Sequence, residues 1–244
     1  MSTGTRTAGA RVARVLVVTA HPDDVDFGAA GTVASWRAAG VEVSYCVCTS
    51  GQAGEVAALP RSQVPALRER EQRAAAAEVG VTDVTFLGYH DGTVTPSPAL
   101  RRDITRVIRT VRPDRVVTHS PEINWARLAV SHPDHRAVGE ATVAAVYPDS
   151  RNQYAHPELA SAGLAAWTVR ELWLTEAPPE RVNHAVDITE TFPHKMAALR
   201  AHASQTSHLA DLETWLRAEL AANGRAHGLG ADQLAEVFQL VDVG

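Results

Sequence analysis

The 244-residue sequence predicts an α/β protein with a mostly parallel sheet. Apolar, strand-length runs alternate with segments rich in strong helix formers, as is typical of parallel strands joined by crossover helices. Polar side chains follow directly after the runs, and open parallel sheets form their sites at the carboxyl ends of their strands. We therefore expect a Rossmann-like, three-layer α/β/α fold with its site at that edge of the sheet.

The first half of the chain supplies four expected strands. These apolar, β-branched runs lie at residues 14–20, 42–50, 84–89 and 114–120. Helical patterns separate them at residues 28–39, 61–79 and 99–111. The second of these helices is rich in Arg, Glu and Ala and closes on Gly80, a residue type that ends helices because it adopts left-handed backbone angles.

The second half continues the pattern less regularly. A helix is expected within residues 131–148, followed by a loop rich in Pro, Asn and Gln up to Gly163. Two further strands are expected at residues 169–177 and 182–189. The chain then becomes helical at residues 192–205 and 209–222.

The composition excludes several classes of protein. Hydrophobic residues make up 45% and charged residues 21%, as in ordinary soluble domains with a core. The net charge is -5 without a basic stripe, and no apolar run approaches the roughly 20 residues of a membrane span. We expect a flexible tail at residues 1–12, one domain over 13–244, a small-molecule substrate, and no nucleic-acid or membrane partner. The sequence leaves open whether the protein forms a homo-oligomer.

Two further patterns bear on nucleotide cofactors and on the redox state of the compartment in which the protein works. The chain has neither a GxGxxG turn nor a Walker phosphate loop, so a nucleotide-binding enzyme is not indicated. Cys46 and Cys48 are two residues apart on an expected strand, where a disulfide fits poorly. We expect them to be free, buried thiols in a reducing cytoplasm.

Two short motifs carry the expected chemistry: HPDD at His21–Asp24 and HPDH at His132–His135. A catalytic zinc site needs three protein ligands from His and carboxylate side chains, with one position open. His21 and Asp24 can reach one ion, because a three-residue spacing on a turn entering a helix puts both on the same side. His135 can supply the third ligand. One such motif alone is equally explained as an acidic helix cap, whereas two favour a metal site.

The remaining motif residues then have catalytic roles. Asp23 can act as the general base toward the attacking water. His132 can donate a hydrogen bond or a proton on the far side of the reacting carbonyl, and Asp134 can orient it. The metal itself stays open, since the same ligands accept Fe²⁺ and other divalent ions as well as Zn²⁺.

The sequence resembles the PIG-L/LmbE family on these motifs. AHPDD at residues 20–24, TSGQAGE at 49–55 and HPDH occur in the family's order, and KMAALRAHASQ at 195–205 is similar to a late segment of the family. The family consists of zinc-dependent N-deacetylases of N-acetylglucosaminyl compounds, among them deacetylases of the mycothiol and bacillithiol pathways.

The resemblance implies residue roles that agree with those above. It places the metal ligands at His21, Asp24 and His135, the base at Asp23, and the oxyanion-side histidine at His132 with Asp134 behind it. It also implies sugar contacts from Asp91 and from an arginine of the helix after the second strand, either Arg68 or Arg70.

Departures from the family pattern concern substrate recognition more than the metal. Val25 stands where the family often has Glu, and Val130 stands where mycothiol-type members have Tyr.

We expect an enzyme that hydrolyses the N-acetyl group of an amino sugar or glycoconjugate. One alternative is an amidase for a larger acyl group, with a pocket shaped by residues 151–163; another is a non-catalytic, metal-dependent glycan-binding protein. His119 and His202 can face the site or serve only in packing.

Overall fold

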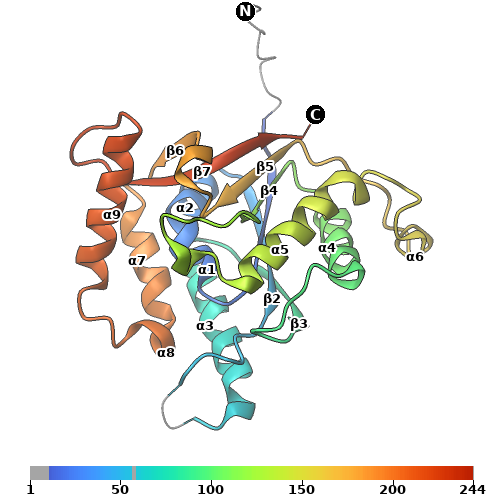
Figure 1. The fold of residues 1–244 in the computed structure, drawn as a ribbon, viewed down its shortest axis with the longest axis horizontal. Helices are drawn as coiled ribbons and strands as arrows, with labels where there is room; N and C mark the ends of the chain where they lie inside the picture. The colour runs from blue at the N-terminus through green and yellow to red at the C-terminus, as the bar shows by residue number, and fades with distance from the viewer. Residues whose placement is uncertain (1–10, 57–58, 244) are drawn as a thin grey trace, which may run out of the picture.

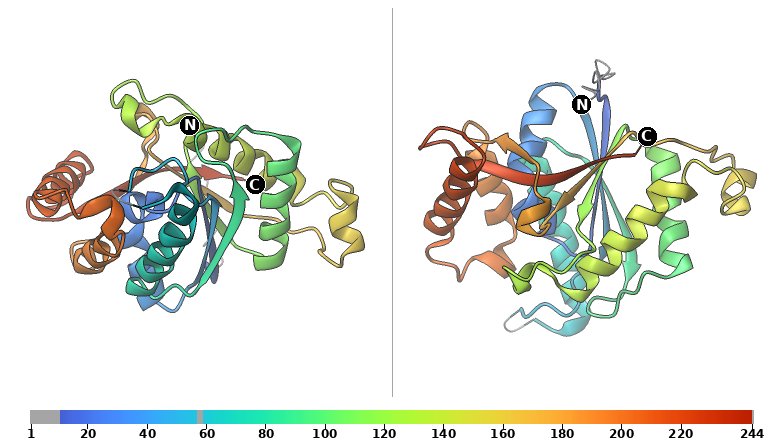
Figure 2. Two further views of the ribbon diagram at one scale, coloured as in Figure 1. Left: turned by 90° about the horizontal axis from the view of Figure 1, so that it is seen from below. Right: turned by 45° about the horizontal axis from the view of Figure 1, so that its top comes forward.

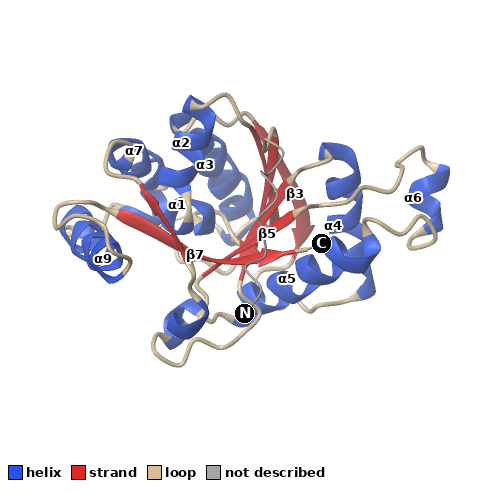
Figure 3. Ribbon diagram, turned by 90° about the horizontal axis from the view of Figure 1, so that it is seen from above, coloured by secondary structure: helices blue, strands red, loops and turns tan. Residues whose placement is uncertain are grey.

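A seven-stranded sheet forms the middle layer of the protein, with helices on both sides (Figure 1 and Figure 3). The computed structural model describes residues 11–56 and 59–243, so most of the expected N-terminal tail lies outside the described residues. The strand order is β3-β2-β1-β4-β5-β7-β6. The expected α/β/α architecture is confirmed, and further views show the same layers (Figure 2).

The first five strands are parallel and pair around β1 and β4. The strands are β1 (Arg14–Thr19), β2 (Glu42–Thr49), β3 (Asp83–Tyr89), β4 (Arg115–His119), β5 (Glu171–Thr175), β6 (His184–Asp187) and β7 (Ala235–Asp242). The last strand, β7, runs antiparallel to both β5 and β6 and was not expected from the sequence. It joins the parallel part of the sheet to β6.

Nine α-helices are described, several of them short. They are α1 (Asp24–Gly28), α2 (Ala30–Ala38), α3 (Val64–Glu78), α4 (Pro98–Val111), α5 (Pro133–Ala144), α6 (Pro157–Ser161), α7 (Phe192–Ala201), α8 (Ala203–Thr206) and α9 (Leu212–Ala226). Shorter helical turns lie at Arg61–Gln63, Leu128–Val130, Ala145–Asp149 and Pro179–Arg181. Within the described residues, no helix has the length and apolarity needed to cross a membrane.

The helix expected at residues 28–39 is α2, and the short helix α1 precedes it and ends where α2 begins, at Ala29. The carboxylate of Glu236 accepts hydrogen bonds from the backbone N–H groups of Gly31 and Thr32, so it satisfies free donors at the start of α2. The expected helix at residues 192–205 is divided at His202.

The sheet is buried on both faces, which explains the continuous apolar runs of its central strands. In β1, Leu16 and Val18 pack into the core shared with α4 and α5. Val15 and Val17 pack on the opposite face with α2 and α3. The sheet thereby fixes the carboxyl ends of the parallel strands at one edge.

A buried ion pair fastens α7 to the corner between α1 and α2. The ammonium of Lys195 donates to Glu236 Oε1 at 2.7 Å and to the carbonyls of Asp26 and Phe27 at 2.9 and 2.6 Å. Both side chains are almost fully enclosed. The pair therefore supports the short helix that begins with Asp24.

Lys195→Met is expected to lower the free energy of unfolding by about 3–5 kcal/mol, because it leaves the buried carboxylate of Glu236 without its cation. Urea unfolding followed by circular dichroism measures the change. Arg200→Met is the matched control on the same helix, because Arg200 belongs to an exposed pair with Glu213 and its loss should leave stability near the parent's. Equal stability of the two variants would contradict the role given to Lys195.

Candidate metal centre

Histidine and carboxylate side chains from five elements meet at the carboxyl edge of the sheet. His21 follows β1, Asp91 follows β3, His119 ends β4, and Glu176 follows β5. His135 comes from the first turn of α5. The edge predicted to hold the site is therefore where the structure gathers these groups.

The three predicted metal ligands lie within contact of one another. His135 Nε2 is 3.2 Å from His21 Nδ1 and 3.1 Å from Asp24 Oδ1. His21 Nδ1 is 3.5 Å from Asp24 Oδ2. Two atoms that each bind a tetrahedral zinc at about 2.0–2.1 Å are about 3.3 Å apart. These three side chains therefore fit one ion of that kind.

The wider cluster offers overlapping ligand sets as well. Three triplets of described residues bring their ligand atoms within 4.8 Å: His21, His132 and His135; Asp24, His119 and His135; and His21, Asp91 and Asp134. Every triplet contains His21 or His135. The orientation of these two rings therefore decides which atoms face an ion.

Two carboxylates orient the ring of His21. Its Nε2 is 3.1 Å from Asp91 Oδ1 and 3.2 Å from Asp134 Oδ2. With the proton on Nε2, the lone pair of Nδ1 points toward Asp24 and His135. Carboxylates that hold the outer nitrogen of a ligand histidine in this way fix its tautomer and increase its basicity.

Asp134 thus lies in a different place from the one implied by the resemblance. Its carboxylate contacts His21 and accepts the backbone N–H groups of Gly92 and Val94 at 2.7 and 3.1 Å. Only its own backbone N–H reaches His132, donating to Nδ1 at 3.2 Å. Asp134 therefore positions the His21 ring through its side chain and His132 through its main chain.

Glu176 orients His135 from the other side, and the sequence reasoning missed it. Its Oε2 lies 3.0 Å from His135 Nδ1 and 2.9 Å from His119 Nδ1. With the ring proton of His135 on Nδ1, shared with Glu176, the lone pair of its Nε2 can face Asp24. The signal available in the sequence was a single acid near the end of the expected strand at residues 169–177.

The electrostatics of the cluster favour a cation. Burial lowers the pKa of His21, but the charge of Asp24 and hydrogen bonds to Asp134, Asp24 and Asp91 raise it to about 12. Burial likewise opposes the rise for His135, whose pKa reaches about 10 through Asp24 and Glu176. The same negative charge that keeps protons on two neighbouring imidazole rings also favours a divalent cation. The cation would take the place of those protons, because metal binding releases them.

Asp23 is held by the face of α3 that packs against the turn. Arg68 Nη2 donates to Asp23 Oδ2 at 2.9 Å and to the carbonyl of Pro22 at 2.8 Å. Gln72 Oε1 accepts the backbone N–H of Asp23 at 2.8 Å. These contacts keep Asp23 at φ 88°, a left-handed conformation that non-glycine residues rarely adopt. The side chain is thus fixed beside the predicted metal ligands.

The pKa of Asp23 suits a base at neutral pH. Burial raises it to about 6, although the charge of Arg68 acts in the opposite direction. Arg68 is 4% exposed, whereas Arg70 faces solvent, so the structure separates the two candidate arginines. Gly51 makes room for Arg68: it has a φ of +65°, and a Cβ there would overlap the guanidinium.

His132 lies at the solvent side of the cluster. Its ring centroid is 5.0 Å from that of His21. Nδ1 accepts the N–H of Asp134, so the ring proton belongs on Nε2. Burial and the charges of His21 and His135 lower the pKa of His132. The ring is therefore neutral at pH 7 and has a donor available.

A buried network behind Asp23 explains the late segment at residues 195–205. His202 Nε2 contacts Asp26 Oδ2 at 2.8 Å, and Gln72 Nε2 donates to the same oxygen at 2.9 Å. His202 is fully buried. It therefore supports the turn that carries Asp23, while His119 lies in the cluster itself, between Asp24 and Glu176.

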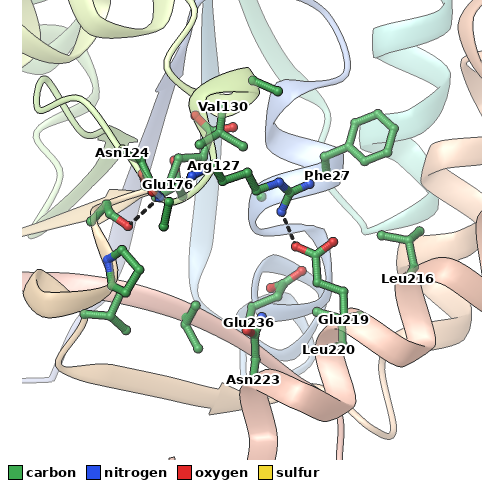
Figure 4. A pocket seen from close by; sticks show the side chains of 18 of the residues that line it. Phe27, Asn124, Arg127, Val130, Glu176, Leu216, Glu219, Leu220, Asn223 and Glu236 are labelled. Carbon is green, nitrogen blue, oxygen red and sulfur yellow. Dashed lines mark hydrogen bonds and ion pairs between the residues drawn. The ribbon is translucent and has the colours of Figure 1, made fainter. Parts of the chain in front are cut away.

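A cavity of about 720 Å³ opens beside two of the predicted ligands, Asp24 and His135 (Figure 4). Asp24, His135 and Glu176 form one end, and α9 forms the opposite wall. Residues 151–163 do not line it. They pack near α4, where Arg109 donates to the carbonyls of Asn152 and Ala155. Figure 1 shows α6 and α9 at opposite ends of the molecule. Residues 151–163 therefore do not shape the cavity beside the metal centre.

Glu176→Gln is expected to weaken divalent-metal affinity about 10–100-fold, because the amide cannot accept the ring proton of His135 as a carboxylate does. Competition with a chromogenic chelator measures the affinity. Glu171→Gln is the control at the opposite end of β5, where Glu171 pairs with Arg115. Parent affinity in Glu176→Gln would show that this carboxylate does not orient a ligand.

Comparison with known proteins gives consistent matches across most of the chain. The PIG-L family model, described as GlcNAc-PI de-N-acetylase, matches residues 16–146. A probable N-acetyl-alpha-D-glucosaminyl L-malate deacetylase 2 of Bacillus cereus is 36% identical over 200 residues, covering 79% of this chain and 83% of the relative. A 1D-myo-inositol 2-acetamido-2-deoxy-alpha-D-glucopyranoside deacetylase of Actinosynnema mirum is 32% identical over 234 residues, covering 80% and 81%.

A solved structure extends the likeness to the fold. The N,N'-diacetylchitobiose deacetylase of Pyrococcus horikoshii superposes with a TM-score of 0.85 at 28% identity. The superposition covers 95% of this chain and 84% of that one. The three relatives share the removal of an acetyl group from an amino sugar and differ, by name, in the group attached to that sugar.

Proposed function

Because the chain belongs to the PIG-L (GlcNAc-PI de-N-acetylase) family, we propose that it hydrolyses the N-acetyl group of an N-acetylglucosamine conjugate. The products are acetate and a free amine. The observation that carries this proposal is the meeting of His21 Nδ1, the Asp24 carboxylate and His135 Nε2 beside a further carboxylate, Asp23, that ligation does not require.

We propose Zn²⁺ as the ion at these ligands, with Fe²⁺ as the second choice for the same donor set. Bound there, a divalent ion would lower the pKa of a coordinated water and polarise the acetamide carbonyl. Each outer ring nitrogen is tied to a carboxylate, so His21 and His135 would bind it as neutral rings.

The protein's own side chains move the protons. Asp23, fixed by Arg68 and Gln72, accepts a proton from the water that adds to the carbonyl carbon. His132 donates its Nε2 proton in a hydrogen bond to the carbonyl oxygen as charge develops there. When the C–N bond breaks, protonated Asp23 gives the proton it took from the water to the leaving amine.

Arg68 and Asp91 are proposed to contact the sugar in addition to holding Asp23 and His21. Arg68 Nε is buried and has no hydrogen-bond partner among the described residues, which leaves it a donor for a ligand. Asp91 Oδ2 accepts the N–H of Ala53, so it connects the loop after β2 to the His21 ring. Arg68 thus connects the base to the loop after β2, and Asp91 connects the same loop to His21.

We further propose that residues 13–244 act as one domain in the cytoplasm with a small-molecule sugar conjugate as substrate. Cys46 and Cys48 are free, buried thiols, which suits a reducing compartment. Relatives that act on named sugar conjugates support the substrate class.

Acetate release from the methyl glycoside of N-acetylglucosamine tests this function. The metal-loaded protein should release one acetate per free amine formed, and a chelator should stop the reaction until a divalent ion is returned. Sugar binding without acetate release would instead indicate a non-catalytic glycan-binding protein.

A further inference from the structure

The cavity beside the metal centre is larger than the reacting group requires. It runs from Asp24 and His135 to α9, beneath the loop that carries Asn124 and Arg127 (Figure 4). Its volume, about 720 Å³, falls in the range of about 300–1,000 Å³ that holds drug-sized ligands. An acetyl group has two carbons, so most of this space is available to another part of the substrate.

The walls of the cavity are mainly apolar. The apolar lining side chains come from α1, the 126–130 turn, α9 and β7, and include Phe27, Val130, Leu216, Leu220 and Val237. Trp215 also lines it and is 45% exposed, which places an aromatic ring at the solvent boundary. Such a lining binds apolar groups by removing their surface from water.

The charges of the cavity disfavour an anionic group. Glu176, Glu219 and Glu236 line it, together with Arg127. The guanidinium of Arg127 forms an ion pair with Glu219 and lies 5.7 Å from the centroid of the Trp215 ring. Its charge is therefore already matched by a carboxylate, and Glu236 is paired with Lys195. No other lysine or arginine among the described residues lines the cavity, so it offers no unpaired basic side chain to an anionic group.

We propose that this cavity is the subsite for the aglycone and that it takes an uncharged, apolar aglycone rather than an anionic one. The inference rests on the proposed deacetylase function. The acetyl group is common to the reactions of the three relatives, whereas malate, inositol and a second sugar differ among them. Extra volume next to the ligands therefore belongs to the variable part of the substrate. The α-malate glycoside, with two carboxylates, would be a poor substrate here.

Three glycosides of N-acetylglucosamine test the subsite: methyl, octyl and L-malate. We expect kcat/KM for octyl to exceed that for methyl by at least about tenfold, since each buried methylene adds favourable binding. The malate glycoside should fall below methyl. Acetate release from the methyl glycoside tests the proposed function separately, so equal values for methyl and octyl would overturn the subsite while leaving the deacetylase intact.

A second arm separates the aglycone from the acyl group. On the methyl glycoside, replacing N-acetyl by N-hexanoyl should give no gain in kcat/KM. A gain there without one for octyl would assign the cavity to the acyl chain and overturn the proposal.

Two matched substitutions on α9 test whether the octyl group occupies this cavity. Ala226 lines the cavity, whereas Ala218 is exposed on the same helix and does not. Ala226→Trp should reduce the octyl-to-methyl ratio of kcat/KM severalfold, and Ala218→Trp should keep the parent ratio. The same ratio in both variants would place the octyl group elsewhere and contradict the assignment.

Discussion

Asp23→Asn is expected to lower kcat for acetate release about 10²–10⁴-fold, because an amide cannot take the proton from the attacking water. Asparagine keeps the size of the side chain and can still accept the hydrogen bond from Arg68. The metal content should therefore stay at the parent value. Initial rates at saturating substrate, together with elemental analysis of the same preparation, separate the loss of a base from the loss of the ion.

Asp211→Asn provides the matched control for that substitution. Asp211 is an exposed residue just before α9, so replacing it changes the net charge by the same amount far from the ligands. It should keep the parent kcat. An Asp23→Asn enzyme with kcat close to the parent's would show that another group accepts the proton.

His135→Ala should abolish acetate release and weaken metal binding beyond the 10–100-fold expected for Glu176→Gln. The substitution removes the Nε2 atom that lies within 3.2 Å of both other ligands. It also leaves Glu176 with one histidine partner in place of two. Isothermal titration with Zn²⁺ measures the affinity.

His156→Ala is the control for the histidine substitution. His156 precedes α6 and pairs with Asp149, far from the cluster. Its loss should leave both the affinity and the acetate release unchanged. Parent-like metal binding in His135→Ala would remove this residue from the ligand set.

The parallel half of the fold could be predicted because its central strands β1, β4 and β5 are buried on both faces and read as unbroken apolar runs. Strand β7 could not, because its pattern includes Glu236 at a buried position. That carboxylate is tolerated only through Lys195 and the backbone of α2, which are distant in sequence. The same carboxylate accepts the first free N–H groups of α2, directly after the end of α1.

In the site as well, residues in short motifs could be predicted, whereas contacts between residues distant in the sequence could not. His21, Asp24 and His135 lie in compact motifs after strands, so their spacing predicts a shared ion. Glu176 has no motif, and its role depends on rings delivered by β4 and α5. Spacing also could not show that the carboxylate of Asp134 turns to His21 while only its backbone N–H reaches His132, because His21 is more than 100 residues away in the sequence.

Anomalous diffraction at the zinc edge from crystals of the metal-loaded protein would locate the ion and so test the proposed ligand set. We predict one peak per chain, bonded to His21 Nδ1, the Asp24 carboxylate and His135 Nε2. A peak between His21 Nε2, Asp91 and Asp134, which form the competing triplet, would contradict it.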